Sequence, residues 1–239
     1  MKNIIITGIS KGLGLEIAKN LLQDGYCVYG INRTVSGELF ELKNRYQNQL
    51  FIKEFDLSHS ETIKEKLFGN FLNLDIPIYA FINNAAIAYD DLITNINLGL
   101  LDKMYRVNVL SPVMMTKYVI RNMLYHRIMG KVIHISSISV HTGYKGLSMY
   151  ASSKGAIEAF SKNTAREWGS RGICSNCIVA GFMETDMSIG LTKEQKDRIY
   201  KRTSLKKPTD KLCVVKTVKF LLNNDSITGQ NIFVDSGTI

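Results

Sequence analysis

Residues 3–22 read NIIITGISKGLGLEIAKNLL, an apolar β-rich run followed by a glycine-containing turn and an amphipathic segment. Leu13, Ile17 and Leu21 recur at helical spacing after the turn. In a strand-turn-helix, glycines let the backbone approach a pyrophosphate, and the free N–H groups at the helix start attract it. The stretch therefore predicts the first β-α unit of a nucleotide-binding α/β sheet, with a glycine turn that binds nothing as the alternative.

The alternation of apolar runs and amphipathic segments continues along the chain. Strands are expected at residues 3–7, 26–31, 50–55, 78–82, 131–135, 173–179 and 231–234. This order predicts α/β architecture, a Rossmann-type doubly wound parallel sheet of about seven strands with helices on both faces. No linker or repeat divides the chain, so we expect a single NAD(P)-binding domain over residues 1–239. The polar, Lys-rich stretch 182–208, with a capping box at Thr192 and Gln195, is predicted to be a lid.

The formal charge is +9, from 30 basic and 21 acidic residues. Such an excess favours an anionic partner or is simply a basic surface. No helix-turn-helix or aromatic-basic platform supports nucleic-acid binding, and no apolar run reaches the roughly 18 residues of a membrane span. No signal peptide is evident, so the cytoplasm is the expected compartment. The four cysteines are expected to remain thiols, and no metal site is predicted because the histidines lack ligand spacing.

The second expected strand ends in residues 31–34, Ile-Asn-Arg-Thr. A carboxylate at this place suits the ribose 2′-hydroxyl of NAD, whereas a cation suits the 2′-phosphate of NADP. Arg33 stands there, and Lys11 lies in the glycine turn. Both cations favour NADPH as the cofactor, with exposed surface charge as the alternative.

Tyr150 and Lys154 stand four residues apart at the start of an expected helix, so they share one face. A nearby ammonium favours the phenolate and would lower the pKa of Tyr150 toward neutral pH, as an acid/base catalyst requires. Two residues that merely share a face are the alternative. Ser137, thirteen positions before Tyr150, ends the fifth expected strand, and Asn108 lies upstream in Arg-Val-Asn-Val.

This set of Asn, Ser, Tyr and Lys resembles the catalytic tetrad of the short-chain dehydrogenase/reductase family. The resemblance extends over residues 3–237: TGxxxGxG at 7–14, Asp56 after the third strand, Asn-Asn-Ala at 83–85, and Gly-Phe-Met-Glu-Thr at 181–185. It implies that Tyr150 donates a proton to the substrate carbonyl, Ser137 orients it, Lys154 holds the nicotinamide ribose, and Asn108 anchors a proton-supplying water. His141, close after Ser137, is a further candidate to line the substrate cleft.

The same resemblance implies a set of cofactor contacts. They are Gly8, Ser10, Lys11, Gly12, Leu13, Gly14, Asn32, Arg33, Asp56, Leu57, Asn83, Ala85, Tyr150, Lys154, Gly181, Met183 and Thr185. Three positions depart from the family pattern: Ala86, Ala180 and Ser236 stand where the family usually has Gly, Pro and Gly. The departures affect cofactor affinity and subunit packing rather than a catalytic group.

Within the family, the stretch 178–187 most resembles bacterial 3-oxoacyl-acyl carrier protein reductases of fatty acid synthesis. That resemblance implies an acidic carrier protein as partner, with Arg127 and Arg171 as candidate docking residues near the cleft, and a homotetramer. The alternatives are a reductase of another ketone or alcohol, such as a sugar or a polyketide-type intermediate, and a non-catalytic NADPH sensor. A sensor would typically lack Tyr150 or Lys154, and both are present.

Overall fold

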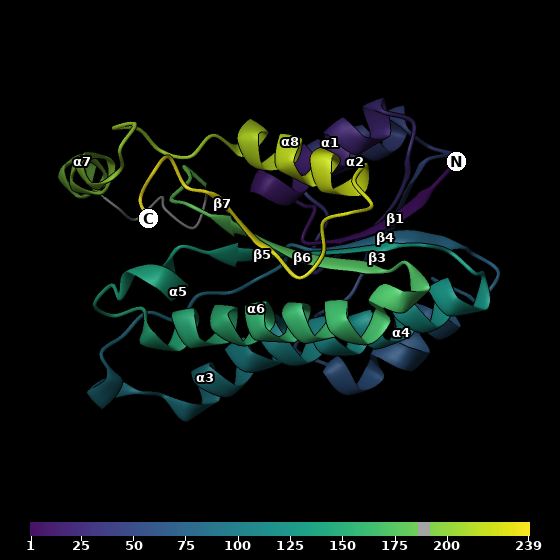
Figure 1. The fold of residues 1–239 in the computed structure, drawn as a ribbon, viewed down its shortest axis with the longest axis horizontal. Coiled ribbons are helices and arrows are strands. Elements are labelled where there is room, and N and C mark those ends of the chain that lie inside the picture. The colour runs from purple at the N-terminus through teal and green to yellow at the C-terminus, as the bar shows by residue number, and fades with distance from the viewer. Residues whose placement is uncertain (186–191) are drawn as a thin grey trace.

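One parallel sheet runs through the middle of the molecule in the computed structural model of the chain (Figure 1), which describes residues 1–185 and 192–239. The strands are β1 (Asn3–Thr7), β2 (Cys27–Asn32), β3 (Leu50–Glu54), β4 (Ile78–Asn83), β5 (Lys131–Ser137), β6 (Cys174–Ala180) and β7 (Asn231–Val234). Their order across the sheet is β3-β2-β1-β4-β5-β6-β7, and every neighbouring pair is parallel. The predicted doubly wound sheet is confirmed.

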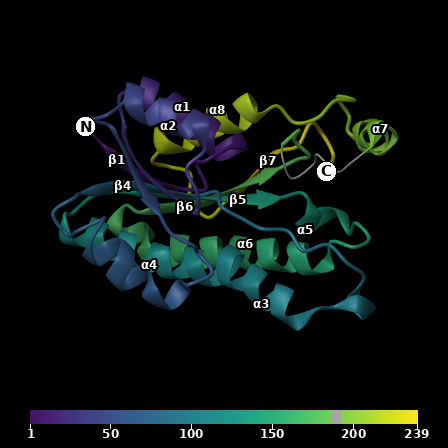
Figure 2. The same ribbon diagram turned by 180° about the vertical axis from the view of Figure 1, so that it is seen from behind.

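Helices cover both faces of this sheet. They are α1 (Gly12–Gln23), α2 (Gly37–Arg45), α3 (Leu98–Tyr105), α4 (Ser111–Tyr125), α5 (Ser139–Thr142), α6 (Ser148–Trp168), α7 (Lys193–Arg202) and α8 (Lys211–Leu222). Helices α1, α2 and α8 lie on one face, and α3, α4 and α6 lie on the other (Figures 1 and 2). A π-helical turn at Arg106–Leu110 joins α3 to α4.

The side-chain alternation of β1 explains why both faces are covered. Ile4 and Ile6 are fully buried among the α1 and α8 side chains, whereas Ile5 is fully buried in a second cluster with Met115 and Val119 of α4. Successive strand residues point to opposite faces, so a strand that is apolar at every position requires a helical layer on each side. The sheet therefore has two cores, and its carboxyl-terminal edge is the place left open for a ligand.

Strand boundaries match the expected ranges to within two residues. The largest difference is at β5, which continues to Ser137 rather than ending at residue 135, because Ser137 pairs with Ala180 in β6. Long-range pairing, which local sequence does not report, makes this extension. Its consequence is functional, since Ser137 is held by the sheet instead of by a loop.

The predicted lid contains α7, which stands apart from the main layers (Figure 1). Its capping box is confirmed: Thr192 Oγ accepts from the Gln195 backbone, and Gln195 bonds back to the Thr192 backbone. Residues 186–191 of the predicted lid lie outside the described residues. Within the described part of the chain, no helix combines the length and apolar character needed to cross a membrane. Cys27, Cys174 and Cys177 are buried free thiols, and Cys213 is an exposed one.

Candidate active site

A cleft of about 960 Å³ opens at the carboxyl ends of the strands. Its wall combines the glycine turn after β1, the ends of β2, β5 and β6, and the start of α6. Parallel strands all end at this edge, so segments that are far apart in sequence meet there. The tertiary structure thus brings the predicted nucleotide turn and the predicted Tyr-Lys pair into one cavity.

The glycine turn leaves no room for a side chain at Gly14. A Cβ on Gly14 would lie 2.0 Å from the Gly8 carbonyl oxygen and 2.5 Å from Asn84 Nδ2. Gly8 and Gly12 have φ of +73° and +60°, which other residues rarely adopt. Asn84 Nδ2 donates to the Thr7 and Gly8 carbonyl oxygens at 3.0 and 3.1 Å and holds the turn closed.

The start of α1 is suited to an anion. Lys11 stands at its N-cap, and the first turn of α1 has no acidic residue, so the positive end of the α1 dipole faces the cleft. Asn32 lines the cleft as well, and its buried Oδ1 has no hydrogen-bond partner among the residues that the structure describes. A buried acceptor left in this way calls for a donor such as a ribose hydroxyl. The donor set therefore fits a dinucleotide, whose pyrophosphate would lie at α1.

The adenosine end of the cleft carries both charge signs. Lys11, Arg33 and Asp56 all line it. Burial acts to raise the pKa of Asp56, but hydrogen bonds from Ser58 and the positive charges of Arg33 and Lys103 outweigh it, so the pKa is lowered. Asp56 is therefore ionised at neutral pH, and Arg33 lies close enough to interact with its charge.

Ser137, Tyr150 and Lys154 meet at the other end of the same cleft. Lys154 Nζ is buried, donates to the Ile135 carbonyl oxygen at 2.8 Å and lies 5.7 Å from the centroid of the Tyr150 ring. Burial lowers the pKa of Lys154 to about 8, although the neighbouring Cys177 and Glu158 act in the raising direction.

The Tyr150 phenol does not have the lowered pKa that the sequence predicted. Burial, and then the charge of Asp90, raise the pKa of Tyr150 to about 12, while a hydrogen bond with Ser137 acts in the lowering direction. The Lys154 ammonium donates its hydrogen bond to the Ile135 carbonyl oxygen instead, and it does not shift the pKa of Tyr150. The phenol consequently keeps its proton at neutral pH, as a proton donor must.

Asn108 does not line the cleft. It is buried in the π-helical turn, where its Nδ2 donates to the Ile87 carbonyl at 2.9 Å and to Ser153 Oγ at 3.0 Å, and its Oδ1 accepts from the Ile87 backbone at 2.9 Å. Ile87 lines the cleft. Asn108 therefore positions the segment after β4 and ties it to α6; its predicted water contact stays a prediction.

Of the two asparagines at the end of β4, only Asn84 lines the cleft, although only Asn83 was predicted to contact the cofactor. Asn83 is buried at the end of β4, bonded to His134 Nδ1 at 3.2 Å, and does not line the cleft, whereas Asn84 does. The predicted contact of Asn83 with the cofactor, partly through its backbone, stays a prediction. Strand alternation already separates the two side chains, and that signal could have identified Asn84.

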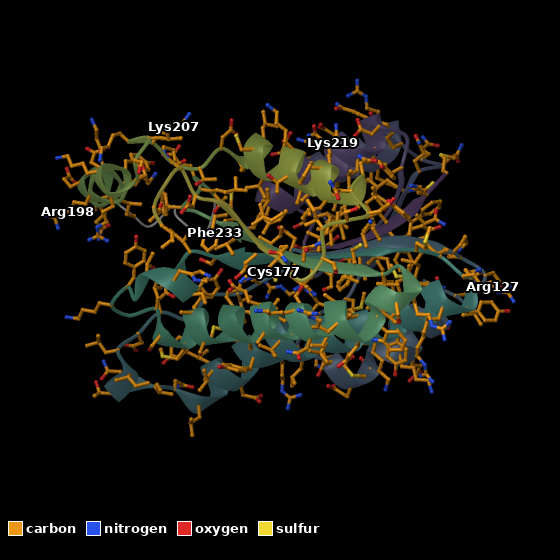
Figure 3. All side chains as sticks on the ribbon, viewed as in Figure 1. Arg127, Cys177, Arg198, Lys207, Lys219 and Phe233 are labelled. Atoms are coloured by element: carbon orange, nitrogen blue, oxygen red, sulfur yellow. The ribbon has the colours of Figure 1, made fainter. Side chains whose placement is uncertain are left out.

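A buried carboxylate lies directly behind the reactive end. Glu158, one turn after Lys154 in α6, accepts hydrogen bonds from Ser136 Oγ and from Asn231 Nδ2 at 2.7 Å, and pairs with His141 Nε2 at 3.0 Å. His141 packs at 4.9 Å against the Phe233 ring, which Figure 3 labels. His141 is not among the residues that line the cleft, so that expectation is wrong. Glu158 instead bonds Ser136 and His141, which precede and follow Ser137 in the chain.

The remaining predicted cofactor contacts lie in the cleft wall. They are Gly8, Ser10, Gly12, Leu13, Gly14, Leu57, Ala85, Gly181, Met183 and Thr185. Of the three departures, Ala86 and Ala180 line the cleft, while Ser236 adopts φ of +58°, the conformation for which glycine is the usual residue. Sequence reasoning missed Asp90, Tyr144, Lys145, Ile199 and Arg202, which also line the cleft.

The two candidate docking arginines do not stand at the cleft. Arg127 follows α4 and Arg171 follows α6, and neither lines the cavity. Figure 3 places Arg127 at the end of the molecule opposite Arg198 of α7. The expected position near this chain's own cleft is therefore wrong, and their docking role stays a prediction.

Comparisons with known proteins agree with this geometry. The family model described as short chain dehydrogenase matches residues 2–196. The 3-oxoacyl-(acyl-carrier-protein) reductase FabG of Haemophilus influenzae is 30% identical, over 99% of this chain and 97% of that protein. A solved structure titled ElxO with NADP bound has a TM-score of 0.88 and 27% identity, covering 99% of this chain and 98% of that one. A 4-hydroxyisoleucine dehydrogenase complexed with NADH shares the fold, with a TM-score of 0.93, 24% identity, and coverage of 100% and 98%.

Proposed function

The chain belongs to the short-chain dehydrogenase family, and we propose that it is an NADPH-dependent reductase of 3-oxoacyl groups on an acyl carrier protein. Membership of this family makes the protein an oxidoreductase that uses a nicotinamide cofactor. The observation that carries the reaction is that Ser137, Tyr150 and Lys154 share one cleft with the glycine turn. The carrier-linked substrate is supported by the likeness to FabG proteins over nearly the full chain.

The cofactor site supports NADPH in particular. The glycine turn and the α1 N-terminus would hold the pyrophosphate, and Arg33 with Lys11 would hold the 2′-phosphate. When bound, NADPH supplies the hydride that the reduction needs. Thr185 and Met183 line the same cleft and would border the nicotinamide.

The residues at the reactive end supply the proton and the orientation. Tyr150, protonated at neutral pH, donates to the carbonyl oxygen of the substrate, and Ser137 Oγ hydrogen-bonds the same oxygen. Ser137 is held at the end of β5 by its pairing with Ala180 and accepts from the Ser139 backbone at 3.2 Å, so it needs little reorganisation. Lys154, in its charged form below pH of about 8, holds the nicotinamide ribose.

The basic lid supports an acidic partner. Helix α7 carries Lys193, Lys196, Arg198, Lys201 and Arg202 against Glu194 and Asp197, and Arg202 lines the cleft. An acidic carrier protein would be drawn to this charge beside the entrance that its acyl group must use. Arg127 and Arg171 would contribute only if a second copy of the chain brings them to this entrance.

We further propose that the chain assembles as a homotetramer. Leu98, Leu100 and Leu110 are 76%, 50% and 46% exposed along α3 and the π-helical turn, and Phe220 is 51% exposed on α8. Apolar surface on the helical layer and beside the β7 edge is suited to contacts with further copies.

A substrate comparison tests the proposed function. Purified enzyme with NADPH should reduce acetoacetyl-acyl carrier protein with a higher kcat/KM than a panel of simple ketones and sugars. Tyr150→Phe should keep NADPH binding, because the ring stays, and lower kcat about 10²- to 10⁴-fold, the usual contribution of a general acid.

Tyr105→Phe is the matched control, because Tyr105 bonds Ser152 Oγ at 2.8 Å and does not line the cleft. It should retain activity. Equal turnover by the Tyr150→Phe variant would overturn the proton-donor assignment, and a sugar or simple ketone preferred over the acyl substrate would favour the alternative reductase.

A further inference from the structure

The end of the cleft beyond Tyr150 carries charges that proton and hydride transfer do not use. Tyr144 and Lys145 lie in the loop between α5 and α6, and Arg202 ends α7; all three line the cleft. The loop lies between Ser137 and Tyr150 in the chain, so it borders the site where the carbonyl must sit. This end therefore faces the part of the substrate that extends away from the cofactor.

Arg202 is brought to the cleft by the anchoring of α7. Glu184, which follows β6, accepts from Tyr200 Oη at 2.7 Å and lies 3.9 Å from Lys196 Nζ. The Phe182 and Tyr200 rings are 6.1 Å apart. These contacts fix the rotation of the helix, and Ile199, one turn before Arg202, lines the same cleft.

The stacking of Arg202 leaves its hydrogen-bond donors available. Its guanidinium carbon lies 5.3 Å from the centroid of the Tyr144 ring. Stacking on an aromatic face orients a guanidinium while its in-plane N–H groups remain able to bind a carboxylate or phosphate in bidentate fashion. Within residues 1–185 and 192–239, neither Arg202 nor Lys145 forms an ion pair with an acidic side chain.

The acid in this part of the cleft lies on the side of the catalytic phenol. Asp90 lines the cleft, and its neighbour Asp91 donates its backbone N–H to the Gly146 carbonyl oxygen at 3.0 Å. The pKa of Tyr150 is raised by burial first and by the charge of Asp90 second, so the carboxylate lies within electrostatic reach of the phenol. Asp90 would repel an anion from Tyr150 and direct it to the cations.

We propose that the substrate carries an anionic group beyond its reacting carbonyl, and that Arg202, stacked on Tyr144 and assisted by Lys145, binds this group. The proposal rests on the carbonyl site proposed above. The anion is the free carboxylate of an oxo acid or the phosphate of a pantetheine arm that carries the acyl chain. A carboxylate is a planar oxyanion and a phosphate is a tetrahedral one, and a guanidinium binds either group through paired hydrogen bonds.

The test compares matched charged and neutral substrates with NADPH. One pair is a free 3-oxo acid and its methyl ester, and the other is the 3-oxoacyl thioester of 4′-phosphopantetheine and that of pantetheine. Arg202→Gln should lower kcat/KM about 10- to 100-fold for the charged member of the pair that matches the natural anion, as expected for a lost charged hydrogen bond, and change the neutral member less than about threefold. The affected pair identifies the source of the anion.

Arg45→Gln is the control, because Arg45 ends α2, is exposed and does not line the cleft. It removes the same charge and should leave both pairs unchanged. An Arg202→Gln variant that slows charged and neutral members equally would show that Arg202 only latches α7 to Tyr144 and would overturn the proposal.

Reduction of the neutral substrates with no preference for their charged partners would overturn this inference while leaving the proposed reductase intact. If the wild-type enzyme reduces none of these four substrates, the proposed function fails. A binding measurement then still tests whether Arg202 binds an anion. Calorimetry of the enzyme-NADPH complex with a saturated carboxylic acid and its amide, and with 4′-phosphopantetheine and pantetheine, provides that measurement. Binding of either charged compound that weakens in Arg202→Gln but not in Arg45→Gln supports the site, and equal affinity for charged and neutral compounds overturns it.

Discussion

A Gly14→Ala substitution, which adds one methyl group, directly tests whether α1 approaches the turn after β1 too closely for a side chain. Gly14 is buried in the first turn of α1, and the Cβ of an alanine would lie 2.0 Å from the Gly8 carbonyl oxygen and 2.5 Å from Asn84 Nδ2. An ordinary contact is 3.4 Å or longer, so the α1 backbone and the turn after β1 would have to separate by about 1.4 Å.

The cost of that separation follows from the contacts it disturbs. Overpacking of a rigid, buried site costs about 1 to 3 kcal/mol. The two hydrogen bonds from Asn84 to the Thr7 and Gly8 carbonyls, at 3.0 and 3.1 Å, contribute about 1 kcal/mol each. Gly14→Ala should therefore lower the free energy of unfolding by about 3 to 5 kcal/mol, which corresponds to a fall in Tm of about 6 to 20 °C for a chain of this size.

Thermal unfolding followed by circular dichroism measures the stability, and a fluorescence titration with NADPH measures the cofactor Kd. We expect the Kd to rise at least about tenfold, because the turn and the α1 N–H groups no longer converge. Gly37→Ala is the matched control: Gly37 opens α2, is exposed, and a Cβ there meets nothing within 4 Å. A Gly14→Ala protein that unfolds within about 2 °C of the wild type and keeps its Kd within about twofold would refute the close approach of α1 to the turn.

Three further predictions concern charged groups that line the cleft or lie directly behind it. Arg33→Asp should raise the KM for NADPH about 10- to 100-fold and leave the KM for NADH nearly unchanged in steady-state assays, whereas equal changes would make Arg33 surface charge. In the free enzyme Lys154 is an ammonium below its pKa of about 8 and Tyr150 stays protonated up to about 12, so kcat/KM for NADPH should be highest below pH 8 and decline as the pH rises through it. A plateau extending past pH of about 10 would contradict the lysine role. Glu158→Gln should lower kcat about tenfold by loosening the bonds to Ser136 and His141 on either side of Ser137, and should also move the Lys154 midpoint to lower pH, because the Glu158 charge raises the pKa of Lys154; an unchanged midpoint would contradict this coupling.

Much of the site was predictable because its signals are local in the chain. The turn at 7–14 requires glycines whatever the rest of the molecule does, since Gly8 and Gly12 have positive φ and Gly14 has no room for a side chain. Tyr150 and Lys154 meet because helical geometry places residues four apart on one face. Period-two and period-3.6 patterns likewise placed every strand to within two residues.

Features that depend on long-range packing were missed or misassigned. The raised pKa of Tyr150 results from burial and from Asp90, sixty positions away in the chain, and the Lys154 ammonium is held by a β5 carbonyl that no local pattern identifies. Arg202 stacks on Tyr144 from a helix whose Tyr200 is hydrogen-bonded to Glu184, and none of these contacts is local in the chain.

Backbone conformation and side-chain periodicity are written into short segments, so the amino-acid sequence alone determined the α/β fold class, the nucleotide turn and the identity of the Tyr-Lys pair. Solvation, electrostatic fields and contacts across the cleft arise only when distant segments pack together. Tertiary structure therefore decided which pKa values the acid and the lysine have, and where the cations Lys145 and Arg202 stand relative to the carbonyl site.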